Sequence, residues 1–226
     1  MTQHTQLKER LSQRISALAA FRRASQVTKD SWVNEFLERY TEPHRQYHDV
    51  THIDAMLACY DDAAASLDDD EAVILAIIFH DWVYDPLRRD NEAESARVFE
   101  SFAEDAAVAA ETRRTVRDLI EATTTHTPRD EDEDERTKLF LDFDLEVLSR
   151  PREAYWVYAA QIRGEYGAFD DEAFGRGRTA VLEGFLRREK IYFSDAFAER
   201  EQCARENIQA EIARLKSLGG GDALES

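Results

Sequence analysis

The first 163 residues of this chain contain no glycine, and this absence limits the fold more than any other single feature. All eight glycines lie at or after Gly164, and the four prolines (Pro43, Pro86, Pro128 and Pro151) fall where the apolar periodicity breaks. Strands are normally bounded by turn residues such as glycine, and no segment shows sustained strand alternation between such residues. Long stretches without glycine or proline favour helices, whose interiors both residues destabilise.

Apolar residues recur every three or four positions, which places them on one face of a helix. The first such run is Leu7, Leu11, Ile15 and Leu18. A second run, which ends before Pro43, is Trp32, Phe36 and Tyr40. Another helix is expected to start at about Thr51, a residue suited to capping an N-terminus. Further helices are expected over roughly 70–84, 91–104, 108–124, 138–149, 151–166, 170–190 and 195–217. We therefore predict an all-α fold.

The length of 226 residues suits one domain with a sizeable core. We predict a single all-α domain over residues 1–217, with N-terminal helices at about 5–41 packing on it, and a disordered tail at 218–226. No apolar run approaches the roughly 20 residues that span a bilayer, and the N-terminus lacks the apolar stretch of a signal peptide. Cys59 and Cys203 are expected to be reduced, buried thiols, so the predicted compartment is the cytoplasm.

The chain is strongly acidic, with a formal net charge of −18. No nucleic-acid partner is expected, because no broad basic face can form, and no membrane partner is expected either. The charge is uneven: residues 1–149 carry 17 basic and 33 acidic groups, whereas residues 150–190 carry 8 and 7. An anionic substrate would therefore find positive contacts in the later segment and at a bound cation. The chain is expected to be a monomer or a homodimer.

Histidine and aspartate residues gather in three separated segments, which contain His48 and His52, the pair His80-Asp81, and the two carboxylates Asp142 and Asp144. The pair at 80–81 ends the most apolar run in the chain, residues 72–79. Ionisable side chains at the end of a buried segment must be hydrogen-bonded, paired or bound to metal. Imidazole and carboxylate suit divalent ions such as Mn, Mg, Zn, Ni, Co or Fe. The sequence therefore predicts a divalent metal site.

This pattern resembles the HD superfamily of metal-dependent phosphohydrolases, in which a His, a His-Asp pair and a late Asp lie on helices. His52 and His80 are 28 residues apart, within the usual range of that family. The segment 47–52, Tyr-His-Asp-Val-Thr-His, is similar to the opening motif of the cyclic-nucleotide phosphodiesterase branch, although Asp49 stands where that branch has Asn. A closer resemblance, to a small bacterial group of predicted HD phosphohydrolases, extends from about Arg39 to Ile208. It is carried by Tyr47-His48…His52-Ile53, Phe79-His80-Asp81…Tyr84-Asp85, Asn91-Glu92…Ser95-Ala96 and Asp142…Asp144-Leu145.

The resemblance implies a helical bundle with a metal site in its core. The implied metal ligands are His52, His80, Asp81 and Asp144, and His48 would act as a general acid. Asp144-Leu145 is similar to the step that carries the last ligand in phosphodiesterase-like members. Asp142 would then hold a ligand histidine in place, or would be a surface carboxylate.

Two further residues have both a functional and a structural interpretation. Glu92 lies near the start of a predicted helix, where a carboxylate is favourable on electrostatic grounds alone. The resemblance gives Glu92 a role in positioning water. His126 lies where some HD enzymes place extra histidines that bind a second metal or the substrate. The structural alternative for His126 is a polar residue at a helix C-terminus, which the helix dipole favours.

Residues 150–190, in which basic and acidic groups nearly balance, contain the candidates for substrate contacts, namely Arg163, Tyr166, Arg178 and Arg187. Guanidinium groups pair with phosphate in a bidentate fashion. Surface salt bridges with nearby glutamates, Glu165 and Glu183, are the structural alternative.

We therefore expect a metal-dependent phosphohydrolase that acts on a small phosphate ester or anhydride, such as a nucleotide, through a metal-activated water. A non-catalytic nucleotide-sensing module is one alternative, but all the expected ligands are present, and a degenerate module would be expected to lack one or more. A di-iron oxygenase of the same superfamily is the other. That chemistry requires additional histidines between the His-Asp pair and the late Asp, and this chain has only His126 there.

Overall fold

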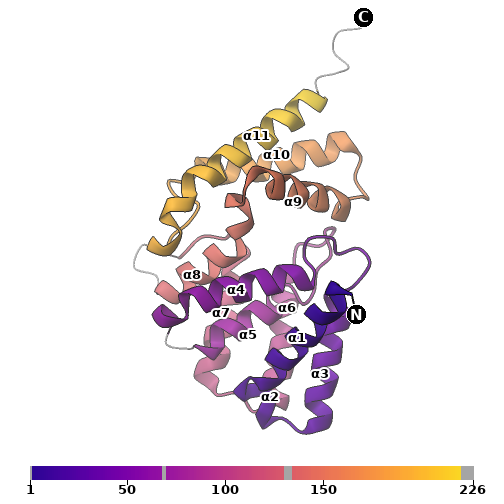
Figure 1. Cartoon of the computed structure of the whole chain (residues 1–226), viewed down its shortest axis with the longest axis vertical. Coiled ribbons are helices and arrows are strands. Elements are labelled where there is room, and N and C mark those ends of the chain that lie inside the picture. Colours follow the sequence, from indigo (N-terminus) through magenta and orange to yellow (C-terminus); the bar gives the residue numbers. More distant parts are fainter. Residues whose placement is uncertain (1, 68–69, 130–133, 220–226) are drawn as a thin grey trace, which may run out of the picture. The chain divides into compact units, whose positions relative to one another are not determined.

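The computed structural model describes residues 2–67, 70–129 and 134–219. Within these ranges the chain is built from α-helices and two short 3-10 helices, and no strand occurs there (Figure 1). The all-α prediction is confirmed for the described residues.

The helices form two compact units, Met1–Phe143 and Asp144–Ser226. The first contains α1 (Gln3–Ala17), α2 (Ala19–Arg23), α3 (Gln26–Arg39), α4 (Val50–Leu67), α5 (Glu71–Phe79), α6 (Asn91–Asp105), α7 (Ala110–Ala122) and α8 (Glu135–Asp144) up to its last residue. The second contains η1 (Glu146–Ser149), α9 (Arg152–Glu165), α10 (Asp171–Arg187), η2 (Asp195–Arg200) and α11 (Glu201–Gly219). That residues 1–217 act as a single domain stays a prediction.

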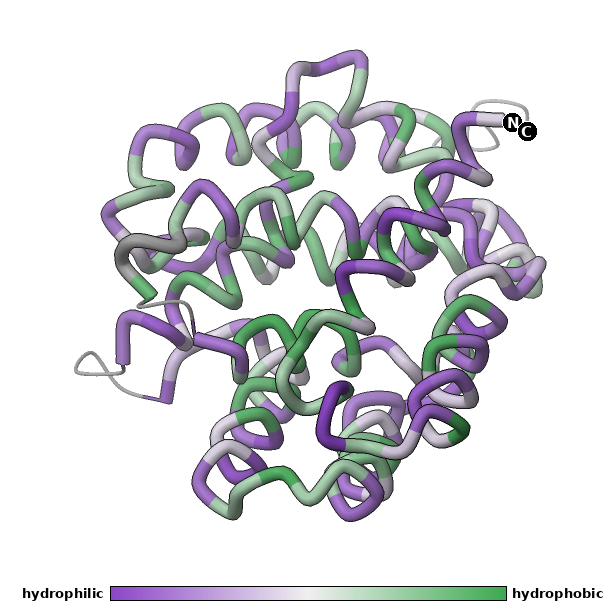
Figure 2. Tube along the Cα trace, turned by 60° about the horizontal axis from the view of Figure 1, so that its bottom comes forward, coloured by the Kyte–Doolittle hydropathy of each residue, from purple (hydrophilic) through white to green (hydrophobic). Residues whose placement is uncertain are grey.

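Helix α5 is the centre of the first unit. Its large apolar side chains at positions 73, 75 and 77–79 are all buried. A helix without a polar face must be covered on every side, and α4, α6 and α7 pack against it. Burial of each large side chain stabilises the fold by about 1.5–3 kcal/mol. Most other helices are amphipathic, and Figure 2 shows hydrophobic and hydrophilic residues alternating along them.

Aromatic rings surround the C-terminal end of α5. Phe79 and Trp82 stack with their ring centroids 4.7 Å apart, and Trp32 of α3 meets both rings edge-on. Phe102 of α6 lies 5.1 Å from Phe79. Aromatic pairs of this kind contribute about 0.5–1.5 kcal/mol beyond the burial of their area. The turn that follows α5 therefore packs against a cluster of aromatic rings.

Helix α5 ends at Phe79, whereas the sequence predicted a helix to about residue 84, so the His-Asp pair at 80–81 lies at the helix end and in a turn. The last carbonyl groups of a helix have no backbone partner and must find another donor. The hydroxyl of Tyr40, on the segment after α3, donates to the carbonyl oxygen of Ile78 at 2.9 Å. This long-range bond helps to end α5 earlier than its own sequence indicates.

Helix α4 begins at Val50, and Asp49 caps it in place of the predicted cap Thr51. The Asp49 carboxylate accepts hydrogen bonds from the backbone N–H and the hydroxyl of Thr51, at 2.7 and 2.6 Å. Asp and Asn cap helices about equally well, so Asp at this position preserves the turn. His48 precedes α4, so His48 and His52 do not lie on the same helix.

Helix α11 is the centre of the second unit, where α9, α10, η1 and η2 pack against it. Its Glu211 forms a buried ion pair with Arg178, with Nε and Oε1 2.8 Å apart. The Tyr155 hydroxyl donates to the same carboxylate. Burial, and then the negative charge of Glu211, raise the pKa of Tyr155 far above its usual value. Removing one partner of such a pair typically costs about 3–5 kcal/mol, because it leaves a buried charge uncompensated.

Other boundaries differ from the sequence prediction by small amounts. The predicted helix at 138–149 divides into α8 and the 3-10 helix η1, and the one at 195–217 begins as η2. Leu218 is still helical, and the rest of the predicted tail from residue 220 lies outside the described residues. Cys59 and Cys203 carry reduced thiols, as predicted, but both are half-buried. No helix in the described ranges combines the length and the apolarity that crossing a bilayer requires.

Candidate metal centre

Three potential metal ligands converge where α4 passes the end of α5. The Nε2 atoms of His52 and His80 lie 3.3 Å apart. Oδ2 of Asp81 lies 3.1 Å from Nε2 of His80 and 3.8 Å from Nε2 of His52. Both imidazoles are buried, while the Asp81 side chain is 18% exposed. Solvent therefore reaches the group from the side of the carboxylate.

The spacing of these three atoms suits a metal coordination shell. Bonds of about 2.0–2.2 Å, at angles of roughly 90–110°, place neighbouring nitrogen and oxygen ligands about 2.8–3.6 Å apart. Two of the three separations fall within this range, and the third exceeds it by about 0.2 Å. His52, His80 and Asp81 can therefore hold a metal ion.

A backbone hydrogen bond determines which nitrogen of His80 faces the other ligands. Its Nδ1 lies 3.0 Å from the carbonyl oxygen of Ile77. A carbonyl oxygen can only accept, so Nδ1 carries a proton, and Nε2 of the neutral ring presents a lone pair. Ligand histidines in metalloproteins commonly donate their other N–H to a backbone carbonyl in this way. When His80 is neutral, its Nε2 lone pair and the Asp81 carboxylate lie side by side. Two groups of this kind are stabilised by a cation between them.

His48 lies next to the three ligands. Its ring centroid is 5.7 Å from that of His52. The His48 ring stacks on Tyr84, with centroids 4.2 Å apart, and Tyr47 meets it edge-on at 4.9 Å. His48 is half-buried, so solvent can reach it while the two aromatic rings restrict its orientation. Imidazole is a common general acid or base in enzymes, so His48 is a candidate for such a role.

Side chains of α6 hold the turn that follows the His-Asp pair. Ser95 accepts a hydrogen bond from the backbone N–H of Val83 at 3.0 Å. Asn91 bonds both the N–H and the carbonyl oxygen of Asp85, at 3.2 and 2.9 Å. Asn91 and Ser95 are one helical turn apart and share a face of α6. The Asn91-Glu92…Ser95 element therefore anchors the turn, a role that the sequence alone did not reveal.

Glu92 and His126 also belong to the first unit. Glu92 is the second residue of α6 and is half-buried. His126 follows α7 with φ of 47°, and its backbone N–H bonds to the carbonyl oxygen of Ala122 at 3.0 Å. His126 lies in the turn four residues beyond the end of α7. The catalytic role of Glu92 and the substrate-binding role of His126 stay predictions.

Helix α8 carries both candidates for the late ligand. Asp142 is fully buried, whereas Asp144, the last residue of the helix, is half-buried. Phe140 of the same helix meets the ring of His80 edge-on, with centroids 6.1 Å apart. Residues four apart share a helix face, so Asp144 lies on the face of Phe140. Asp142 is two positions from Phe140 and lies on a different face.

We expect Asp144→Asn to weaken divalent metal binding by more than about 100-fold, beyond the usual effect of a residue that only supports a ligand. Asp142→Asn is the matched control on the same helix and should keep most of the affinity. Zinc content after dialysis against metal-free buffer measures both variants. The opposite order would make Asp142 the ligand.

The four candidates for substrate contacts belong to the second unit, where Arg163 and Arg178 have specific partners. Arg163 pairs with Asp171 at 2.7 Å and donates to two backbone carbonyls, those of Tyr166 and Phe169. It therefore holds the α9–α10 turn. Arg178 pairs with Glu211 instead of the predicted glutamates. A contact with substrate stays a prediction for each candidate.

Arg178 is deeply buried, and burial alone would lower its pKa, but Tyr158 and Glu211 outweigh this effect and the pKa is raised. Its guanidinium therefore stays charged. Tyr166 is the C-cap of α9, and Arg187 is the last residue of α10 and is exposed. Glu183, one of the predicted partners, pairs with Lys216.

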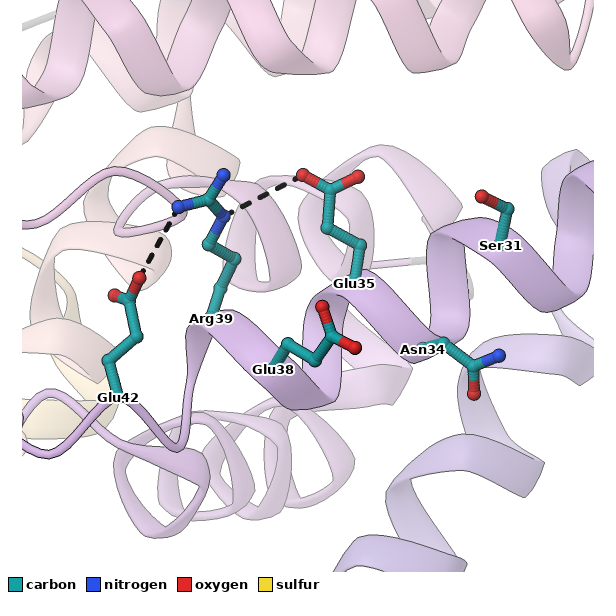
Figure 3. A pocket seen from close by; sticks show the side chains of 6 residues that line it. All are labelled: Ser31, Asn34, Glu35, Glu38, Arg39 and Glu42. Atoms are coloured by element: carbon teal, nitrogen blue, oxygen red, sulfur yellow. Dashed lines mark hydrogen bonds and ion pairs between the residues drawn. The ribbon is translucent and has the colours of Figure 1, made fainter.

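A separate cavity of about 550 Å³ lies on α3, apart from the metal ligands. Figure 3 shows the residues that line it, which are Ser31, Asn34, Glu35, Glu38, Arg39 and Glu42. Arg39 is paired with Glu35 and Glu42 on its two sides. An acidic lining repels anions, so this cavity is unsuited to a phosphate-bearing substrate.

Comparisons of this chain with family models, with curated proteins and with solved structures gave no match. Any function proposed for this chain therefore rests on its own sequence motifs and on the geometry of His52, His80 and Asp81.

Proposed function

We propose that this protein is a divalent metal-dependent phosphohydrolase of the HD type, which cleaves a small phosphate ester or anhydride such as a nucleotide. The observation that carries the proposal is the convergence of His52 Nε2, His80 Nε2 and Asp81 Oδ2 within 3.8 Å, beside a half-exposed His48. Asp144 is proposed as the fourth ligand. The resemblance of the motifs to HD phosphohydrolases gives the reaction class, which the geometry alone does not specify.

The protein residues have distinct tasks in this proposal. A bound divalent ion supplies a nucleophile from water at neutral pH and stabilises charge on phosphoryl oxygens. The backbone bond of His80 keeps its Nε2 available as a ligand. His48, held between Tyr47 and Tyr84, donates a proton to the departing oxygen. Glu92 is proposed to position water.

The non-catalytic sensing module is the weaker alternative. A protein that only binds a nucleotide needs no proton donor next to its metal ligands. The half-exposed imidazole of His48, 5.7 Å from the ring of His52, is such a group. This placement favours turnover over binding alone.

A phosphate-release screen tests the proposal. Purified protein is stripped of metal and supplied in turn with Mn, Co, Ni, Mg or Zn, and incubated with nucleoside mono- and triphosphates, cyclic nucleotides and nitrophenyl phosphates. We expect release with at least one metal in the wild type, and none above background in Asp81→Asn, which weakens a charged ligand while keeping its shape. Metal binding without release from any substrate would support the sensing module instead.

A further inference from the structure

Arg45 connects the segment of His48 to the turn that carries Asp81. Its side chain is fully buried, and its Nε pairs with Glu42 at 3.1 Å. One terminal nitrogen donates to the carbonyl oxygens of His48 and Asp81, at 3.1 and 2.8 Å. The other donates to the carbonyl oxygen of Trp82 at 2.9 Å. A single guanidinium therefore binds three backbone carbonyls from two separate segments.

The surroundings of Arg45 keep the guanidinium in one orientation. Its carbon Cζ lies 4.9 Å from the ring centroid of Tyr40 and 5.5 Å from that of Tyr84. The Tyr84 ring is the one on which His48 stacks. A buried cation needs hydrogen bonds and a counter-charge to offset its desolvation, and Arg45 obtains both. Such fully bonded buried groups define one arrangement of the backbone.

We propose that Arg45 is a positioning residue that sets the spacing between the metal ligand Asp81 and the proton donor His48. The part that concerns His48 rests on the proposed function, whereas the part that concerns Asp81 requires only that a metal binds. Residues that orient ligands from behind typically alter metal affinity by 10–100-fold when they are replaced. Lysine cannot take over this role, because its ammonium is a point charge without the planar fork that spans three carbonyls.

Cobalt binding tests the link to Asp81 without any substrate. Arg45→Lys is expected to weaken Co²⁺ binding by about 10–100-fold and to change the visible absorption of the bound ion, since the position of the Asp81 carboxylate shifts. The matched control is Arg39→Lys, an exposed arginine that also pairs with Glu42 (Figure 3), and it should bind Co²⁺ like the wild type. Wild-type affinity and absorption in Arg45→Lys, even with a lower melting temperature, would overturn the proposal and leave Arg45 a packing residue.

A double-mutant cycle tests the link to His48. If Arg45 acts through His48, Arg45→Lys should slow substrates with poor leaving groups more than nitrophenyl phosphates, and should add little to the loss already caused by His48→Ala. Fully additive losses would overturn this part. Normal Co²⁺ binding by the wild type without any phosphate release would instead contradict the proposed function. The cobalt measurement would still decide whether Arg45 positions Asp81.

A milder variant keeps the proposal testable if Arg45→Lys does not fold. Glu42→Gln removes the charge that pairs with Nε of Arg45 while it retains an oxygen at that place. It is expected to weaken Co²⁺ binding in the same direction and by a smaller factor. Wild-type cobalt affinity in Glu42→Gln would then count against Arg45 as a positioning residue.

Discussion

His80→Ala is expected to abolish tight binding of divalent ions. The substitution removes a ligand whose Nε2 lies 3.3 Å from His52 Nε2 and 3.1 Å from the Asp81 carboxylate. Only His52, Asp81 and the proposed fourth ligand Asp144 would remain, so the coordination shell would be incomplete and the loss should exceed the roughly 10–100-fold that supporting residues produce. Asp81→Ala should have the same effect, since it removes a carboxylate that lies 3.1 Å from His80 Nε2 and 3.8 Å from His52 Nε2. Elemental analysis after dialysis measures both variants.

The control for this experiment is His4→Ala, which removes an exposed histidine of α1. It should retain as much metal as the wild type. Circular dichroism and melting temperature show whether each variant is folded, so that loss of metal is distinguished from loss of structure. Folded His80→Ala and Asp81→Ala proteins with wild-type metal content would remove the basis of the functional proposal.

His48→Ala is expected to retain the metal and to lose turnover by about 10²–10⁴-fold, the usual contribution of a general acid. The expectation follows from its position, stacked on Tyr84 and 5.7 Å from the ring of the ligand His52. The loss should be smaller for nitrophenyl phosphates, because their leaving groups depart without a donated proton. Steady-state kinetics over a series of leaving groups, together with metal analysis, provides the measurement.

Two results would assign His48 a different role. A His48→Ala protein that loses its metal would make His48 a ligand. An equal loss for good and poor leaving groups would mean that His48 binds or positions the substrate. Because His48 lies before α4 rather than on it, the substitution leaves the helix that carries His52 intact.

The helical fold could be predicted because it depends on local patterns. The apolar run at 72–79 predicted a buried segment, and α5 is the helix that the first unit surrounds. Spacing of three and four predicted α1 and α3. The end of α5 could not be predicted in this way, since the donor to its Ile78 carbonyl is Tyr40, which is 38 residues away.

His52 and the adjacent pair His80-Asp81 were predicted as metal ligands from two separate segments, and the structure brings the three side chains together in a group that could hold a metal ion. The residues that hold the backbone around these three side chains were not predicted from the sequence. Arg45 acts on backbone carbonyls, and Asn91 and Ser95 bond backbone atoms of the same turn. A backbone atom can accept or donate such a bond whatever its residue type, so these partners cannot be recognised from the sequence. One signal was present: an arginine three positions before His48, in a segment of buried aromatic residues, needs partners.

The arginines of the second unit show the opposite difficulty. Arginine commonly binds phosphate, so these residues were predicted to contact substrate. The residue type alone did not identify the partners that they have in the structure. Arg178 pairs with Glu211, which is 33 residues later and belongs to α11. The packing of α10 against α11 creates this pair, and no spacing rule within one helix would predict it.

The ion content and ligand set of the wild-type protein test the metal centre most directly. The protein is loaded with Zn²⁺, dialysed against metal-free buffer, and examined by elemental analysis and by X-ray absorption at the zinc edge. We expect at least one retained ion per chain in the wild type, with scattering from two imidazole rings. Any zinc held by His80→Ala should show scattering from only one. A wild-type protein that retains no ion, or an ion without imidazole ligands, would contradict this expectation.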